Sequence, residues 1–292
     1  MTVAVYSRPN PVENQQALTD LFGTLKKIKA QVLVYKPFAQ TIEGVLRAFN
    51  FSSTFETASD LGQKTDYLVS IGGDGTLLDT LSLVRDSGIP VLGINLGRLG
   101  FLTGVGHREI KNAIKQLDKG SFSIDQRSLV QLHANKPLFG GFDVALNEFA
   151  IQKKDTSSMI SIDVLLDGKL LNTYWADGLM VATPTGSTGY SLSCGGPIIL
   201  PTSKSFVITP ICPHNLSTRP IVVPDDLEVS FRISSRDSHA LVTLDSRQET
   251  IDESCHLAIK KADFCFNLIS LNDQTFLNAL KSKLMWGMDK RN

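Results

Sequence analysis

The residues whose types and spacing best suggest chemistry are the five that read Gly72-Gly73-Asp74-Gly75-Thr76. Glycines let a backbone approach a phosphate closely, and the amides of such a turn can donate to its oxygens. Asp74 is the informative member, because a phosphate repels a carboxylate unless a metal ion or a hydroxyl lies between them. The turn is neither a Walker loop nor the dinucleotide fingerprint Gly-x-Gly-x-x-Gly. A tight turn with a helix-capping aspartate is the simpler interpretation.

Two further stretches combine polar groups with small residues. Asn147 and Glu148 interrupt the apolar run 144–150, so they either line a site or end a strand in solvent. Residues 176–191 join Asp177 to an apolar strand and then to a loop of hydroxyls and glycines. A ligand can lie against such a backbone, and the hydroxyls can hydrogen-bond a ribose or an amide. Gly195-Gly196-Pro197-Ile198 is predicted to be a structural turn, and His214 a loop residue.

The elements that position these residues follow from the spacing of apolar side chains. Apolar runs at 3–6, 32–35, 67–71 and 89–94 alternate with helical patterns at 14–29, 41–49, 77–84 and 108–117. Such alternation predicts a Rossmann-like parallel sheet with ligands outside the carboxyl ends of its strands. The glycine turn and the loop 95–102 both follow such ends.

The pattern changes beyond residue 121. Strand-like segments then follow one another to residue 271, separated by turn signals such as Gly140-Gly141 and Asp167-Gly168. The final helical pattern, Thr275 to Trp286, is expected to return to the first domain. We therefore expect α/β plus β architecture: an α/β nucleotide-binding domain at 1–121, with 272–292 packing back on it, and an antiparallel β-rich domain at 122–271.

Composition narrows the classes of function. The 292 residues contain 29 Lys plus Arg and 29 Asp plus Glu, so no basic excess favours a nucleic-acid partner. No stretch approaches the roughly 18 apolar residues of a membrane span, and no signal peptide is recognisable. The four cysteines have no metal-ligand spacing and are predicted to be reduced thiols. These features predict a cytoplasmic protein without a membrane partner.

Together the motifs resemble those of the NAD kinases. The resemblance is carried by GGDGT (72–76), GINLGRLGFL (93–102), LNE (146–148), ADGLMVATPTGSTGYSLSCGGPI (176–198) and PHNLSTRPIVVP (213–224). GGDGT alone is shared with diacylglycerol kinases, sphingosine kinases and phosphofructokinases. The long block 176–198 is specific to the NAD kinases.

The resemblance implies an enzyme that phosphorylates the adenosine 2′-hydroxyl of NAD, using ATP and Mg²⁺ or another divalent metal, at a site between the domains. It implies that Asp74 is the catalytic base and that the β domain supplies most NAD contacts. The NAD-binding residues implied are Asp74, Gly75, Asn147, Glu148, Asp177, Thr185, Thr188, Gly189, Tyr190, Ser191, Leu192, Ser193 and Arg247. Gly72, Gly73 and Thr76 would lie on the ATP side, and no residue is assigned as a metal ligand. A homodimer or homotetramer is expected.

The sequence departs from the family at several places, one of them Trp175, which precedes Ala-Asp-Gly where the family varies. Asp79 stands where many members carry a basic residue. Residues 244–248 read Leu-Asp-Ser-Arg-Gln where the family usually has Asp-Gly-Gln, so either Arg247 or Gln248 could face the ligand.

Three rival functions have less support. A lipid kinase is disfavoured because no amphipathic membrane-binding stretch is present. A nucleotide-binding regulator without turnover is disfavoured by the intact Asp74 and Asn147-Glu148. A dehydrogenase is disfavoured because the dinucleotide fingerprint is absent. Polyphosphate as donor and NADH as acceptor remain open.

Overall fold

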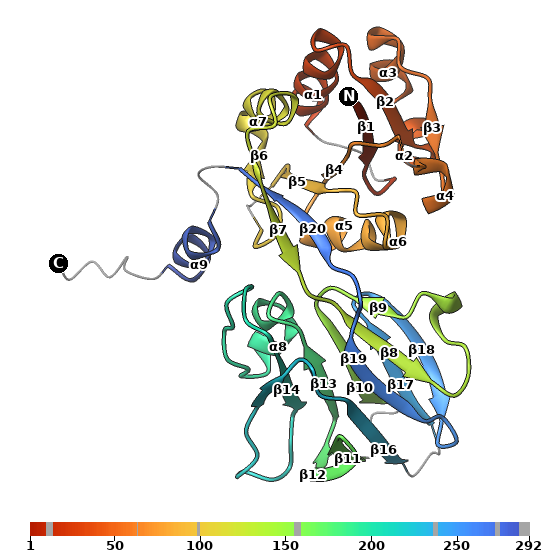
Figure 1. Cartoon of the computed structure of the whole chain (residues 1–292), viewed down its shortest axis with the longest axis vertical. Coiled ribbons are helices and arrows are strands. Elements are labelled where there is room, and N and C mark those ends of the chain that lie inside the picture. The colour runs from red at the N-terminus through yellow and green to blue at the C-terminus, as the bar shows by residue number, and fades with distance from the viewer. Residues whose placement is uncertain are drawn as a thin grey trace, which may run out of the picture. The chain divides into compact units, whose positions relative to one another are not determined.

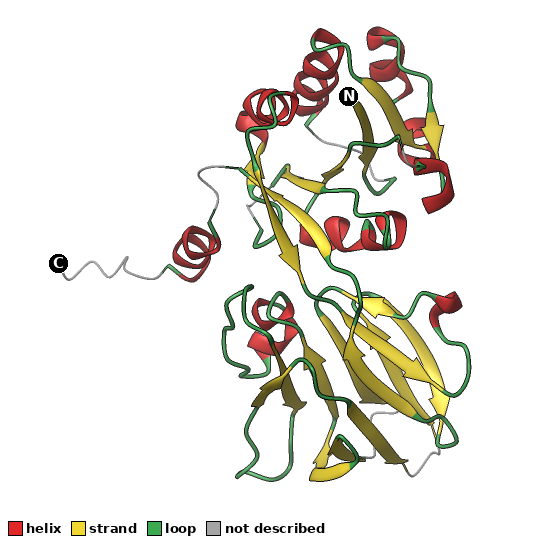
Figure 2. Cartoon of the chain, viewed as in Figure 1, coloured by secondary structure: helices red, strands yellow, loops and turns green. Residues whose placement is uncertain are grey.

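The computed structural model describes residues 1–9, 14–62, 64–97, 100–154, 159–235, 239–271 and 275–285. The chain forms two compact units, one of residues 1–126 with 266–292 and one of residues 127–265 (Figure 1). Helices are concentrated in the first unit, and the second consists mostly of strands (Figure 2). No helix within the described ranges is long and apolar enough to span a bilayer.

The first unit is built on one mostly parallel sheet. In spatial order its strands are β3 (Thr54–Phe55), β2 (Gln31–Tyr35), β1 (Thr2–Tyr6), β4 (Tyr67–Ile71), β5 (Val91–Asn95), β20 (Phe266–Ser270) and β7 (Ser123–Arg127), with β6 (Val105–Gly106) paired to β5. The central strands are apolar and buried almost throughout, as expected for parallel strands covered on both faces. In the parallel ladders, Tyr6 lies opposite Ser70 and Ile71 opposite Ile94. The segments that follow β1, β4 and β5 therefore leave the sheet beside one another.

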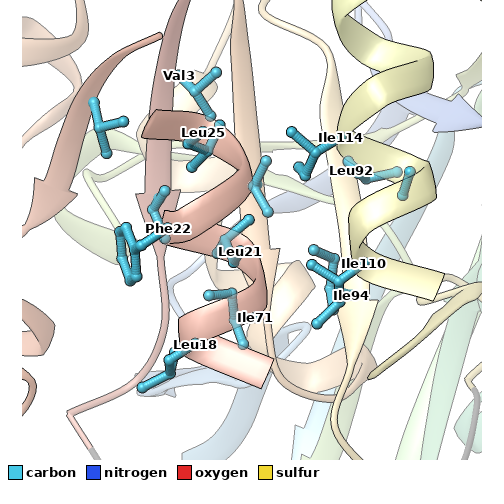
Figure 3. Packing of buried hydrophobic residues seen from close by; sticks show 14 of the residues in the cluster. Val3, Leu18, Leu21, Phe22, Leu25, Ile71, Leu92, Ile94, Ile110 and Ile114 are labelled. Carbon is cyan, nitrogen blue, oxygen red and sulfur yellow. The ribbon is translucent and has the colours of Figure 1, made fainter. Parts of the chain in front are cut away.

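Helices α1 (Gln15–Lys27) and α7 (Ile110–Asp118) bury their apolar sides against this sheet. Figure 3 shows Leu18, Leu21 and Leu25 on α1 and Ile110 and Ile114 on α7, which belong with the strand residues Leu92 and Ile94 to one cluster of buried side chains. The Asn14 side chain caps α1 by accepting from the Ala17 amide at 3.1 Å. The remaining helices of this unit are α2 (Lys36–Thr41), α3 (Glu43–Phe49), α4 (Ala58–Leu61), α5 (Asp74–Asp79), α6 (Leu81–Val84), the 3₁₀ turn η1 (His107–Glu109) and α9 (Phe276–Leu284).

The second unit contains two six-stranded antiparallel sheets. One has the order β15 (Ile221–Pro224), β14 (Ser205–Ile211), β13 (Gly178–Ala182), β10 (Glu148–Lys153), β17 (His239–Leu244) and β18 (Arg247–Asp252). The other has the order β12 (Lys169–Ala176), β11 (Ile160–Leu166), β16 (Val229–Ser235), β19 (Leu257–Lys261), β8 (Val130–Ala134) and β9 (Val144–Ala145). Their inner faces share one core, in which the rings of Phe149 and Phe231 lie 5.5 Å apart. Short helical turns η2 (Phe139–Gly141), η3 (Gly186–Thr188) and α8 (Tyr190–Ser193) complete the unit.

The predicted fold class, α/β followed by antiparallel β, is confirmed. Along the chain, the boundaries between the units fall at residues 126/127 and 265/266, whereas the sequence placed the changes at 121/122 and 271/272. The difference arises because β7 and β20 join the first sheet, and a strand's own pattern does not reveal its partner. Helix α9 belongs to the first unit, where the ring of Phe276 lies 6.4 Å from that of Phe101. Trp286, the predicted end of this helix, lies outside the described residues.

Candidate active site

The glycine turn connects β4 to α5 in a conformation that requires its first glycine. Gly72 has φ +150°, and a Cβ there would lie 2.4 Å from Oγ1 of Thr76. Its amide donates to the Ile94 carbonyl at 2.9 Å, which ties the turn to the end of β5. Gly73 is exposed, with no heavy atom of the described residues within 4 Å of where its Cβ would be. The turn thus leaves open space above its backbone.

Asp74, half-buried at the start of α5, is held by the loop that follows β5. Its Oδ1 accepts from the Leu102 amide (3.2 Å), the Thr103 amide (3.0 Å) and the Thr103 hydroxyl (2.7 Å). Among the described residues, its Oδ2 accepts only from the Phe101 amide, at 2.7 Å. A Cβ on Gly100 would lie 1.7 Å from Oδ1, so this loop can approach only because residue 100 is glycine. The carboxylate is therefore fixed in one orientation.

The two oxygens of Asp74 differ in what they can still accept. A carboxylate has about four lone-pair positions, two on each oxygen. Three donors saturate Oδ1, whereas the single donor that the described residues give Oδ2 leaves one position open. The Thr103 hydroxyl also accepts from Nδ2 of Asn95 at 2.9 Å, which directs its proton toward Oδ1. With the donors that the described residues supply, Oδ2 is consequently the oxygen of Asp74 that can accept a further hydrogen bond.

The loop containing Phe101 and Thr103 corresponds to the motif GINLGRLGFL and the residue after it. Its members Arg98 and Leu99 lie outside the described residues. The sequence predicted that this loop lies at the carboxyl edge of the sheet, but the pairing of Thr103 with Asp74 was not foreseen. No periodicity links residues that are 29 positions apart.

Asp79, where the sequence departs from the family pattern, is engaged by a cation that follows β1. Arg8 donates from Nε to Oδ2 of Asp79 at 2.6 Å and from Nη2 to Oδ1 at 3.0 Å. Nη2 also donates to the Gly75 carbonyl at 3.1 Å. A positive charge thus lies beside the glycine turn.

In the second unit, Asn147 and Glu148 lie where three strand ends meet. Glu148 opens β10 and is opposite Ala182, the last residue of β13. Asp245 follows β17 and accepts from the Leu146, Asn147 and Glu148 amides at 2.8, 2.8 and 3.2 Å. Asp245 has φ +51°, a left-handed conformation that Asp tolerates in a hairpin turn. The role of this carboxylate in supporting the Asn147-Glu148 pair was not predicted from the sequence.

The carboxyl group of Glu148 is buried and only partly hydrogen-bonded. Within the described part of the chain, its Oε2 has no hydrogen-bond partner. Burial, with a further contribution from the charge of Asp245, raises the pKa of Glu148 from 4.5 to about 8. Burial also raises the pKa of Asp245, against the opposing effect of its three amide donors. A buried, unpaired oxygen is costly unless a ligand satisfies it.

The loop after β13 packs directly over this pair. The Thr183 amide donates to the Asn147 carbonyl at 2.8 Å, and a Cβ on Gly186 would lie 2.2 Å from that same oxygen. The Cβ position of Gly189 lies 3.5 Å from Oε2 of Glu148 and 3.7 Å from Nδ2 of Asn147. The structure therefore brings together Asn147, Glu148 and the turn at Gly189.

The other predicted residues of this loop differ in accessibility. Two are buried and use their hydroxyls internally: Thr185 receives a bond from Arg127 Nη1 at 3.3 Å, and Ser191 lies 2.9 Å from the Thr209 hydroxyl. Thr188, half-buried, donates to the Thr185 carbonyl at 3.2 Å. Leu192 is half-buried, while Tyr190 and Ser193 are exposed. The exposed members face solvent and are open to a ligand.

Asp177 and Arg247, both predicted to bind NAD, form ion pairs or hydrogen bonds with other residues of the second unit. Asp177 pairs with Lys153 Nζ at 2.6 Å. Arg247 donates to the Phe142 carbonyl at 2.5 Å and to the Val144 carbonyl, and its guanidinium lies 5.0 Å from the Phe142 ring centroid. Burial lowers the pKa of Arg247. Arg247 therefore fixes the segment that leads into Asn147, while the side chain of Gln248 is exposed.

The comparisons with known proteins agree with this architecture. Residues 5–122 match the ATP-NAD kinase N-terminal domain and residues 146–271 match the ATP-NAD kinase C-terminal domain. NAD kinases from Cytophaga hutchinsonii and Flavobacterium psychrophilum are 44% and 42% identical, each covering 100% of both chains. Yeast NADH kinase complexed with NADH superposes with a TM-score of 0.87 at 23% identity, covering 100% of this chain and 89% of that one. An NAD kinase from Archaeoglobus fulgidus in complex with ATP gives 0.73 at 24%, covering 98% and 99%.

The fold and the two matched domains define a phosphotransferase. This chain belongs to the NAD kinase family, which confirms the resemblance seen in its motifs.

Proposed function

We propose that this member of the family transfers the terminal phosphoryl group of ATP to the 2′-hydroxyl of the adenosine ribose of NAD, giving NADP and ADP. Relatives of 40–44% identity over the whole chain, all NAD kinases, support the reaction. The observation that carries the mechanism is that the described residues supply Oδ2 of Asp74 with a single donor, the Phe101 amide, whereas Oδ1 accepts from three.

Asp74 acts as the general base in this mechanism. An alcohol is a weak nucleophile until its proton is accepted. Oδ2 takes the 2′-hydroxyl proton while the ribose oxygen forms its bond to the γ-phosphorus. The bond from that phosphorus to the bridging β–γ oxygen breaks, and ADP leaves with the electron pair. The four donors from the Phe101–Thr103 loop keep Asp74 oriented, so no reorganisation is needed at the moment of transfer.

The donor phosphates occupy the open space at the glycine turn. Gly73 and Gly75 are exposed, and Gly72 and Thr76 shape the turn beneath them. Among the described residues, no three His, Cys, Asp or Glu side chains form a metal-binding group. This arrangement fits Mg²⁺ carried mainly by nucleotide phosphates, which needs one or two carboxylates at most. When bound, the metal neutralises charge on the transferring phosphoryl group.

The second unit binds NAD. Asn147 offers an amide to the ribose and adenine region, and Glu148 offers a carboxyl oxygen to which the described residues donate no hydrogen bond. Thr188, Gly189, Tyr190, Leu192 and Ser193 surround the adenosine, with Thr185 and Ser191 supporting them from inside. Asp177 contacts the nicotinamide end, and Arg247 supports the segment before Asn147. We assign the first unit to the phosphate side and the second to NAD, in a cytoplasmic homodimer or homotetramer.

The test is formation of NADP by the purified protein. ATP, Mg²⁺ and NAD are mixed with the enzyme, and NADP is identified by mass spectrometry. Parallel reactions replace NAD with NADH, or ATP with polyphosphate, which decides the acceptor and donor that the sequence left open. Product bearing the new phosphate elsewhere than the adenosine 2′-oxygen, or no product from a folded protein, contradicts the proposal.

A further inference from the structure

Arg8 lies two residues beyond the end of β1, at the same edge of the sheet as the glycine turn. Because Tyr6 is opposite Ser70 in the parallel pair of β1 and β4, the chain after β1 leaves the sheet beside the chain after β4. Nη2 of Arg8 reaches the Gly75 carbonyl at 3.1 Å, one residue from Asp74. Arg8 is therefore a neighbour of the turn in space, although 67 positions separate it from Gly75 in sequence.

The guanidinium group of Arg8 is held in place by hydrogen bonds, but not all of its N–H groups donate to a described residue. Asp79 accepts from Nε and Nη2 with its two oxygens, and the Tyr6 phenol donates to Oδ2 of Asp79 at 3.2 Å. Burial, with the charge of Asp79, raises the pKa of Tyr6, so this phenol stays a donor. Nη1 donates to no residue in the described ranges, and 46% of the Arg8 side chain is exposed. A planar fork held on one edge presents its other edge to solvent.

The negative charges near the glycine turn suggest what the exposed edge of the Arg8 guanidinium does. Asp74 and Asp79 place two carboxylates on α5, directly after the turn that would receive a phosphate chain. A polyanion approaching them is repelled unless a cation is close. Arg8 supplies one that is already oriented, and the N–H groups of a guanidinium form charge-assisted hydrogen bonds to phosphate oxygens.

We propose that Arg8 binds a phosphate oxygen of the phosphoryl donor through Nη1, and that Asp79 and Tyr6 are positioning residues for its guanidinium group. The inference rests on the proposed function, since it concerns the donor side of that reaction. It assigns to the Arg8–Asp79 pair a role in the affinity for ATP rather than for NAD.

The test compares Arg8→Gln and Arg8→Lys with the wild-type enzyme. We measure KM for ATP and for NAD separately, and Kd for Mg·ATP by calorimetry in the absence of NAD. Arg8→Gln is expected to raise KM and Kd for ATP about tenfold or more, with KM for NAD unchanged. Arg8→Lys keeps the charge but loses the fork, so it should recover part of the affinity. Asp79→Asn, which frees the guanidinium, should weaken ATP binding in the same direction by less.

Arg47→Gln is the matched control. Arg47 forms an exposed ion pair with Glu43 in α3 at 2.9 Å, outside the segments that follow β1, β4 and β5. If Arg8→Gln lowers only the thermal stability, as the control does, or raises KM for both substrates equally, the inference is overturned. A different result is that the wild-type protein binds ATP but makes no NADP, and that Arg8→Gln loses this ATP binding. That result supports the role of Arg8 in binding ATP and contradicts the proposed reaction. Normal NADP formation with unchanged ATP affinity contradicts Arg8 alone.

Discussion

Gly100 lies so close to Asp74 that a Cβ atom on it would stand 1.7 Å from Oδ1 of the carboxylate. Even alanine at residue 100 must displace either the carboxylate or the loop that binds it. A misplacement of about 1 Å can reduce turnover by about 10²-fold, so we expect that loss in kcat for Gly100→Ala. Gly44→Ala is the control, because no described atom lies within 4 Å of that Cβ position. Normal kcat in a folded Gly100→Ala protein would show that the orientation of Asp74 is not required.

Asp74→Asn tests the base itself. The amide cannot accept the hydroxyl proton, so kcat should fall at least about 100-fold, while the Kd for NAD by calorimetry stays within about tenfold. The amide NH₂ also meets backbone donors that now face a carboxylate, so a stability loss of about 1–3 kcal/mol is expected. Chemical denaturation measures that loss. NADP formation at near the normal rate would remove Asp74 from the mechanism.

Thr103→Val tests how much the orientation of Asp74 contributes to the rate while the carboxylate itself is kept. The substitution removes the 2.7 Å hydroxyl bond to Oδ1 and leaves Oδ2 unaltered. We expect kcat to fall by about tenfold, less than in Asp74→Asn, because two amides still hold Oδ1. Single-turnover kinetics at saturating ATP and NAD measure the effect on the chemical step. A loss as large as that of Asp74→Asn would mean that Thr103 itself contacts a substrate.

Arg247→Ala should act through the backbone that precedes Asn147. The substitution removes the hydrogen bonds that the guanidinium donates to the Phe142 and Val144 carbonyls, and we expect a lower melting temperature. Displacement of this segment should raise KM for NAD several-fold with little change in kcat. Gln248→Ala, at the adjacent exposed position, is the comparison. If only Gln248→Ala raises KM, then Gln248 is the residue that contacts the ligand.

The buried carboxyl of Glu148 predicts a pH-dependent stability. Its pKa is raised from 4.5 to about 8, so the folded protein keeps a proton that the unfolded chain releases. Stability should therefore fall as pH rises from about 4.5 to 8 and become constant above that window. Glu148→Gln should flatten this part of the curve, measured as melting temperature against pH. An identical slope in the variant would show that another group causes it.

The spacing of apolar residues was sufficient to predict an α/β unit followed by a β unit, because this spacing reflects which face of each helix or strand is buried. The helix predicted at 41–49 corresponds to α3, which begins at Glu43, whereas the short helix α2 before it was not predicted; Pro37 lies in the first turn of α2, where its fixed φ is favourable. The strands β7 and β20 were assigned to the second domain because partner choice in a sheet is a long-range property.

In the candidate site, too, residues could be predicted where neighbouring positions reveal them, but contacts between residues far apart in the sequence could not. Asp74, Asn147 and Glu148 were recognisable as polar residues in unusual local settings. Asp245, which binds the amides of the Asn147-Glu148 pair, lies nearly one hundred residues away and leaves no local signal. Likewise, nothing in the sequence indicates that the Thr185 and Ser191 hydroxyls are bonded inside the unit.

The position of β20 has a consequence for the order in which the protein can form on the ribosome. This strand pairs between β5 and β7, yet it is translated only after the whole second unit. Domains usually fold in the order of their synthesis, but here the N-terminal sheet cannot close until residues 266–270 have left the exit tunnel. Until then β7 lacks the strand that joins it to β5, and unpaired strand edges of this kind can pair with other chains.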